Sequence, residues 1–160
     1  MKYMKASEVE AWTSAKQNLM NHPRYDSAAV VKFVDLRRQL ILACQQSGVG
    51  LLLGSDAPQV FDVPGFSLHH ELKYLVDSGI TPYEALRTGT VNVARFYQRD
   101  DIGVVKKGAV ADLVLLNGNP LTDINQSKNI EGVMVANQWL PKTYIEAALK
   151  KLLKKNRDKP

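Results

Sequence analysis

Apolar residues recur at steps of three and four along much of the chain, which is the spacing of one face of an α-helix. The longest such stretch runs from Ser27 to about Gln46, and Gly48 follows it at the position where glycine commonly ends a helix. Shorter stretches predict further helices over residues 7–19, 68–78, 82–88, 92–97 and 141–153. We therefore expect a chain rich in short amphipathic helices.

Three of these helices are preceded by a residue that can cap their first turn. Ser7 with Glu10, and Thr81 with Glu84, have the three-residue spacing of a capping box. A proline follows Thr81 at the first helical position, where its missing N–H costs nothing. Ser67 can cap the helix that follows it.

Short apolar runs bounded by turn residues predict the strands. Val49–Leu53 lies between Gly48 and Gly54 and has the composition of a buried parallel strand. After about residue 98 the runs become shorter and alternate with turn residues. Strand or strand-and-turn segments are expected there over residues 104–107, 111–116, 130–136 and 138–140, with the last two joined as a hairpin at Asn137.

The predicted strand Val49–Leu53 delivers a single carboxylate, Asp56, to its carboxyl end. In α/β folds, ligands bind at the carboxyl ends of parallel strands, so this is where a catalytic or metal-binding carboxylate would lie. An aspartate that only closes a turn would occupy the same place. Position alone leaves both interpretations open.

Composition and charge narrow the class of protein. The chain has 160 residues, a formal net charge of +5 and 45% hydrophobic residues, which suits an ordinary globular protein. Basic residues gather in Lys150–Arg157, without interleaved aromatic residues, so we expect a solvated helix and no nucleic-acid or membrane partner. The lone Cys44 excludes an intrachain disulfide and is expected in the core. Without a signal-peptide pattern or a long apolar run, a cytoplasmic location is expected.

Several short segments occur in a specific order. They are Gly-Leu-Leu-Leu-Gly-Ser-Asp at 50–56, Ser-Leu-His-His-Glu-Leu at 67–72, Ile-Thr-Pro-Tyr-Glu-Ala-Leu at 80–86, Thr-Val-Asn-Val-Ala-Arg at 90–95, and Lys-Gly-Ala-Val-Ala-Asp-Leu-Val-Leu-Leu at 107–116. In this order the segments resemble the carboxyl-terminal part of the amidohydrolase superfamily, especially its imidazolonepropionase-like and prolidase-like members. The resemblance is close over about Val30–Leu140.

This resemblance implies an α/β fold in three parts. Residues 1–98 would form the last helix–strand–helix units of a (β/α)8 barrel. Residues 99–140 would form part of a small β-sandwich domain, and residues 141–160 a carboxyl-terminal helix with a basic tail.

The resemblance also implies a chemistry, namely metal-dependent hydrolysis of an amide-type C–N bond in a cyclic amide or an Xaa-Pro dipeptide. Asp56 matches the family's strand-end aspartate, a ligand of a zinc-like divalent metal and the base that activates water. Ser67, His69 and Glu71 match the loop and helix that follow, where His69 could contact substrate or hold the loop by hydrogen bonds. The partner of such a site is a small amide or dipeptide substrate.

The chain departs from the family pattern in its metal ligands. The family needs a His-x-His on the first barrel strand and further histidines on middle strands, whereas the three histidines here are His22, His69 and His70. We therefore expect no stably bound metal and no hydrolase activity from this chain alone. An alternative is a non-catalytic, truncated chain or interaction module. In either case the apolar strand predicted at residues 49–53 would need a neighbour, so we expect a homo-oligomer or a complementing amino-terminal chain.

Overall fold

The computed structural model describes residues 1–157, so the last three residues of the predicted basic tail lie outside the described part. Its elements follow in chain order: α1 (Ala6–Met20), α2 (Ser27–Gln46), α3 (Ser67–Asp77), α4 (Pro82–Thr88), α5 (Val91–Phe96), β1 (Leu113–Leu116), the 3-10 helix η1 (Ile124–Lys128), β2 (Ile130–Val135), β3 (Gln138–Pro141) and α6 (Lys142–Arg157). All the predicted helices are present. In the described residues no helix is both long and apolar enough to cross a membrane.

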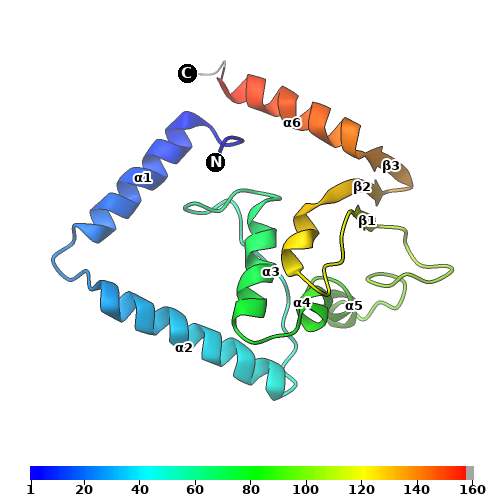
Figure 1. Cartoon of the computed structure of the whole chain (residues 1–160), viewed down its shortest axis with the longest axis horizontal. Coiled ribbons are helices and arrows are strands. Elements are labelled where there is room, and N and C mark those ends of the chain that lie inside the picture. The colour runs from blue at the N-terminus through cyan, green and yellow to red at the C-terminus, as the bar shows by residue number, and fades with distance from the viewer. Residues whose placement is uncertain (158–160) are drawn as a thin grey trace.

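The elements surround a small centre rather than a single large core. Figure 1 shows α3, α4 and α5 in the middle, with η1 beside α3, while α1 and α2 extend as an arc on one side and α6 runs from β3 back toward the start of α1. The buried apolar cluster comes from α3, α4, η1 and the turn between the two helices: Leu72, Leu75, Ile80, Ala85 and Ile124. Only the carboxyl-terminal part of α2 reaches this cluster, through Ile41.

The predicted parallel strand Val49–Leu53 is the main correction. Residues 49–55 are extended but belong to no sheet, because the described residues contain only one multi-stranded sheet and it lies elsewhere. Leu51 and Leu53 pack against the central cluster. The backbone N–H of Leu53 donates to the carbonyl of Thr88 (3.1 Å), and the Asn92 amide donates to the carbonyl of Leu51 (3.0 Å). The segment has the shape and one-sided packing of a strand but no strand beside it.

A glycine allows this extended segment to lie close to the end of α4. A Cβ at Gly89 would stand 2.9 Å from Leu53 Cδ2, which is closer than real Cβ contacts. The side chain of Leu53 therefore occupies space that any other residue at position 89 would need.

The observed N-caps match the predicted one at α4 and differ from the predicted ones at α1 and α3. Thr81 Oγ1 accepts from the Glu84 N–H (3.2 Å) and Glu84 Oε2 accepts from the Thr81 N–H (3.2 Å), so the predicted capping box at α4 is confirmed. At α1 the N-cap residue is Lys5, whose backbone N–H donates to the Glu8 carboxylate, and the predicted Ser7 cap is wrong. Ser67 does not cap α3 and lies inside its first turn.

The carboxyl-terminal sheet is antiparallel in the order β1-β2-β3. Ala136 and Asn137 form the turn between β2 and β3 with φ values of 47° and 62°, the left-handed conformation that asparagine tolerates. This confirms the predicted hairpin. The predicted strand-and-turn at residues 104–107 is wrong as to the strand, because these residues form bends and turns between Gly103 and Gly108.

The capping box yields a stability prediction. Replacing Thr81 with alanine removes the acceptor for the Glu84 N–H and should lower the free energy of unfolding by about 0.5–2 kcal/mol. Urea denaturation followed by circular dichroism measures this. The matched control is Ser14→Ala, an exposed serine inside α1, which should change stability by less than about 0.5 kcal/mol. Equal effects of the two substitutions would contradict the assignment.

Candidate functional site

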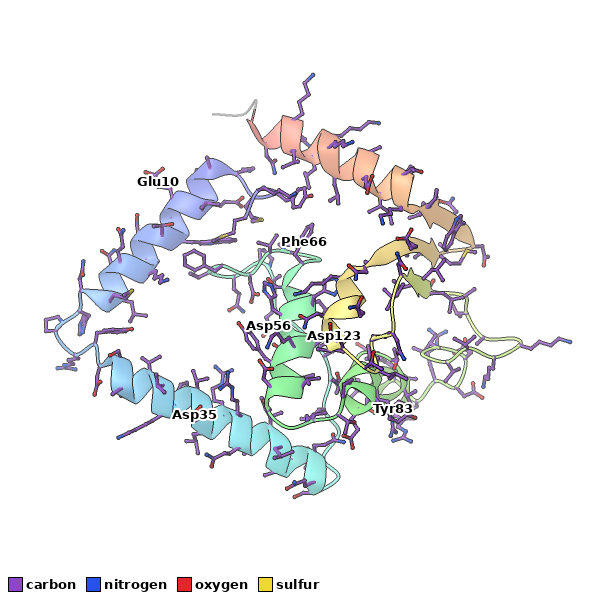
Figure 2. The ribbon with its side chains drawn as sticks, in the orientation of Figure 1. Glu10, Asp35, Asp56, Phe66, Tyr83 and Asp123 are labelled. Carbon is purple, nitrogen blue, oxygen red and sulfur yellow. The ribbon has the colours of Figure 1, made fainter. Side chains whose placement is uncertain are left out.

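Asp56 lies in the loop that follows the extended segment, with its side chain exposed. Its φ is 54°, a left-handed conformation that aspartate adopts more readily than most residues. Figure 2 shows Asp56 beside α3, and its charge acts on Glu71 of that helix. The carboxylate is therefore free to meet a solute at the place where the extended segment ends.

Glu71 is half-buried on α3 and is the centre of a small charged group. Burial raises the pKa of the Glu71 carboxyl above its ordinary value, and the nearby negative charges of Asp62 and Asp56 raise it further. The guanidinium of Arg37 on α2 acts in the opposite direction and lowers it. The group thus holds its carboxylates close enough to repel one another, with one arginine as partial compensation.

A cavity of about 560 Å³ lies between α2 and α3, on the side of this charged group. Arg37 and Arg38 line it from α2, and His70 and Glu71 from α3. Asp62 adds a second carboxylate from the connecting loop. This volume falls in the range of small-molecule sites, and the walls offer both signs of charge.

Ser67 uses its hydroxyl inside the protein. The buried Oγ accepts a hydrogen bond from the Val63 N–H at 2.8 Å. This contact fixes the end of the loop that carries Asp62, immediately before α3 begins. A role of Ser67 toward substrate stays a prediction, and its observed contact is with the loop.

His69 joins α3 to η1. Its Nδ1 lies 3.0 Å from the hydroxyl of the buried Ser127, and the imidazole is half-buried. Burial lowers the pKa of His69, and the positive charges of Lys128 and His70 lower it further. The structure therefore brings His69 to η1, whereas the sequence indicated contact with substrate or with the preceding loop. His70 is exposed and faces the cavity instead.

The residues that surround Asp56 do not fit a metal centre. Structural zinc sites have four protein ligands, and catalytic ones have three and a water. Among residues 1–157 no group of three or more His, Cys, Asp or Glu side chains comes together in a way that could hold a metal ion. Asp56 would supply one ligand at most, so no catalytic step through a metal is derived for this chain.

The sequence interpretation missed two residues of the site. The sequence analysis names neither Asp62, in the loop over residues 59–65, nor Arg37 of α2 as a residue of the site. The loop position at the end of an extended segment was a usable signal for Asp62. Nothing in the sequence indicates that Arg37 would act on Glu71, because the two residues lie on different helices.

The comparisons with known proteins agree on one protein family. The sequence model described as "Amidohydrolase family" matches residues 15–140. An imidazolonepropionase from Rhodococcus jostii (strain RHA1) is 29% identical over 120 residues, which cover 72% of this chain and 27% of that protein. The chain therefore spans about a quarter of the length of this relative.

Solved structures show the same fold within longer chains. The bottromycin amidohydrolase AH matches 97% of this chain and 34% of its own, with a TM-score of 0.73 and 22% identity. A Xaa-Pro dipeptidase with bound methionine in its active site matches 84% of this chain and 33% of its own, with a TM-score of 0.62 and 20% identity.

The raised pKa of Glu71 predicts that removing the charge of this side chain increases the free energy of unfolding, by an amount that depends on pH. A folded pKa above the unfolded one means that the stability contribution of Glu71 is full below its ordinary pKa and is lost as the pH rises through the raised value. Glu71→Gln should therefore raise the free energy of unfolding at pH 7, with the gain disappearing as the pH falls below about 4. Urea denaturation at both pH values measures it.

The control for Glu71→Gln is Glu10→Gln, which makes the same change of charge on an exposed position of α1. It should leave the pH profile of stability unchanged. A Glu71→Gln variant that is less stable than the wild type at pH 7 would mean that Glu71 is stabilised as the anion, contrary to the physical argument.

Proposed function

Because the chain belongs to the amidohydrolase family, we propose that it is the carboxyl-terminal part of a hydrolase that cleaves an amide-type C–N bond in a small substrate. The single observation that carries the proposal is the family match over residues 15–140, a range that contains Asp56 and all the residues of the charged group. The substrate classes it favours are a cyclic amide and an Xaa-Pro dipeptide, in line with the relatives named above.

In this proposal Asp56 takes the proton from the water that attacks the carbonyl carbon. A general base must lie within hydrogen-bond reach of that water, which requires an accessible carboxylate at the ligand-binding end of the fold. Asp56 is exposed and follows directly on the extended segment that packs on the central cluster. Glu71 is less suited as the base, because its side chain is half-buried whereas Asp56 is exposed.

The cavity beside α3 supports the dipeptide over the cyclic amide. A dipeptide is a zwitterion with a carboxylate at one end and an ammonium at the other. Arg37 and Arg38 on one wall suit the carboxylate, since guanidinium groups bind it with two parallel hydrogen bonds. Asp62 and Glu71 on the opposite wall suit the ammonium. A cyclic amide has no such pair of charged ends.

The proposal includes inactivity of this chain in isolation. At least two further protein ligands would have to join Asp56 to hold a catalytic metal, and the described residues supply no such group. Hydrolysis would therefore require side chains from outside this segment. The alternative, a non-catalytic interaction module, has the same residues but predicts that Asp56 matters to no activity in any context.

Metal analysis tests the isolated chain. Purified protein incubated with zinc and then dialysed should retain far less than stoichiometric zinc by elemental analysis. Asp56→Ala should leave the small residual amount unchanged. Stoichiometric zinc that is lost in Asp56→Ala would show that the chain builds a metal centre by itself and would contradict the proposed incompleteness.

A chimera tests the catalytic role of Asp56. The matched part of the Rhodococcus imidazolonepropionase is replaced by the aligned part of this chain, and the activity of that enzyme is assayed. Asp56→Asn should lower kcat/KM by at least about 10²-fold, the usual contribution of a general base. Asp100→Asn, an exposed position outside the site, is the control and should have little effect. A folded, active chimera that is indifferent to Asp56→Asn would favour the non-catalytic alternative.

A further inference from the structure

The extended segment that leads to Asp56 is held along one edge by the junction between α4 and α5. The carbonyl of Leu51 and the N–H of Leu53 point to the same side, as alternate residues of an extended chain do. The Leu51 carbonyl accepts from Asn92 Nδ2 at 3.0 Å, and the Leu53 N–H donates to the Thr88 carbonyl at 3.1 Å. These bonds fix the segment at a point three residues before Asp56.

The two partners at the junction act through different groups. Thr88 is 0% exposed and contributes its backbone carbonyl, while its hydroxyl donates to the carbonyl of Ala85 at 2.6 Å. Asn92 contributes its side chain. A carboxamide is the same chemical group as a peptide unit, so Asn92 offers Leu51 the donor that the N–H of a neighbouring strand would offer. A substitution of the side chain can remove this bond and leave the one to Thr88 in place.

The contact requires a donor at position 92. A backbone carbonyl accepts hydrogen bonds and donates none, so the nitrogen of the Asn92 amide has to face Leu51. Aspartate has nearly the same shape, but its ionised carboxylate would turn an oxygen toward the carbonyl oxygen and repel it. Asn92 is half-buried, so water replaces the lost donor less readily than at an exposed position.

The start of α5, which carries Asn92, is itself held in place. The chain after α5 returns to it, and a Cβ at Gly103 would stand 2.5 Å from the carbonyl oxygen of Thr90. Gly103 therefore allows two backbone segments to meet directly before α5 begins. Ala94, two residues after Asn92, is buried. The side chain of Asn92 thus extends from a fixed base.

We propose that Asn92 is a positioning residue for Asp56, acting through the hydrogen bond to Leu51 that fixes the extended segment. The inference rests on the proposed function, because the position of Asp56 matters to catalysis only if Asp56 is the base. A general base works within hydrogen-bond reach of the attacking water, and a misplacement of about 1 Å can cost about 10²-fold in rate. Asn92 contacts the amino-terminal half of the segment, and Asp56 follows its other end.

Amide hydrogen exchange of the isolated chain tests the anchoring. Asn92→Ala should speed the exchange of the Leu53 N–H by about tenfold, since the segment then opens locally more often. The amide of Val133 in β2, which pairs with both β1 and β3, should change far less. The matched control is Asn18→Ala, an exposed asparagine of α1, which should leave Leu53 unchanged.

Two results of this measurement would overturn the proposal. Unchanged exchange at Leu53 would mean that Asn92 does not hold the segment. Equal acceleration at Leu53 and Val133 would mean a general loss of stability instead of a local release.

A double-mutant cycle in the Rhodococcus chimera tests the coupling to Asp56. Asn92→Ala should lower kcat by at least about tenfold and change KM by less than about twofold, as expected for a misplaced base. In an Asp56→Asn background the same substitution should cost less than about twofold, because Asn92 acts through Asp56. Asn92→Asp keeps the side-chain volume and removes the donor, so it should behave like Asn92→Ala. It also replaces Asn92→Ala if circular dichroism shows that this variant does not fold.

The cycle separates this inference from the proposed function. Asp56→Asn alone reports on the proposed base, and Asn92→Ala with Asp56 present reports on positioning. A large loss from Asp56→Asn with none from Asn92→Ala would overturn the positioning role and leave the proposed function standing. Losses that multiply in the double variant would overturn it as well, because Asn92 would then act independently of Asp56. An Asp56→Asn chimera of full activity would overturn both.

Discussion

The packing of one extended segment on a small helical centre is the interaction on which the rest of the structure depends. Leu51 and Leu53 insert into the cluster formed by α3, α4 and η1, and the carbonyl of Thr88 and the amide of Asn92 hold the adjoining backbone. Gly89 leaves the space that Leu53 needs. Because this segment is fixed, Asp56 has a defined place beside α3 (Figure 2). Without it, α2 would have no connection to the centre beyond its own last turns.

The same segment explains why the candidate site is incomplete. An extended segment with one bonded edge brings only its own residues to the ligand-binding end, whereas a sheet would bring the ends of neighbouring strands to the same place. Asp56 is therefore accompanied by residues from α3, α2 and the loop between 59 and 65, which are carboxylates and arginines. These groups can bind a charged solute, and they do not assemble into a set of metal ligands within the described residues.

The side chains of α3 make contacts on two different sides of the helix. His69 faces η1 and reaches Ser127 across 58 positions of sequence, which ties the carboxyl-terminal sheet region to the centre. His70 and Glu71 face the cavity on the side of α2. Two adjacent histidines thus have different functions, because successive residues on a helix point about 100° apart. The pair could not have formed a shared binding site.

The sequence by itself determined the helices and the hairpin. Each of these follows from local chemistry: the apolar spacing of α2, the reciprocal bonds of Thr81 and Glu84, and the tolerance of Asn137 for a left-handed turn. Tertiary structure alone decided the state of residues 49–57, because an apolar run becomes a strand only where another strand is present to pair with it. It also decided which charges surround Glu71, since Arg37, Asp56 and Asp62 come from separate elements. Residues that are distant in the sequence cannot be recognised as electrostatic neighbours from the local sequence.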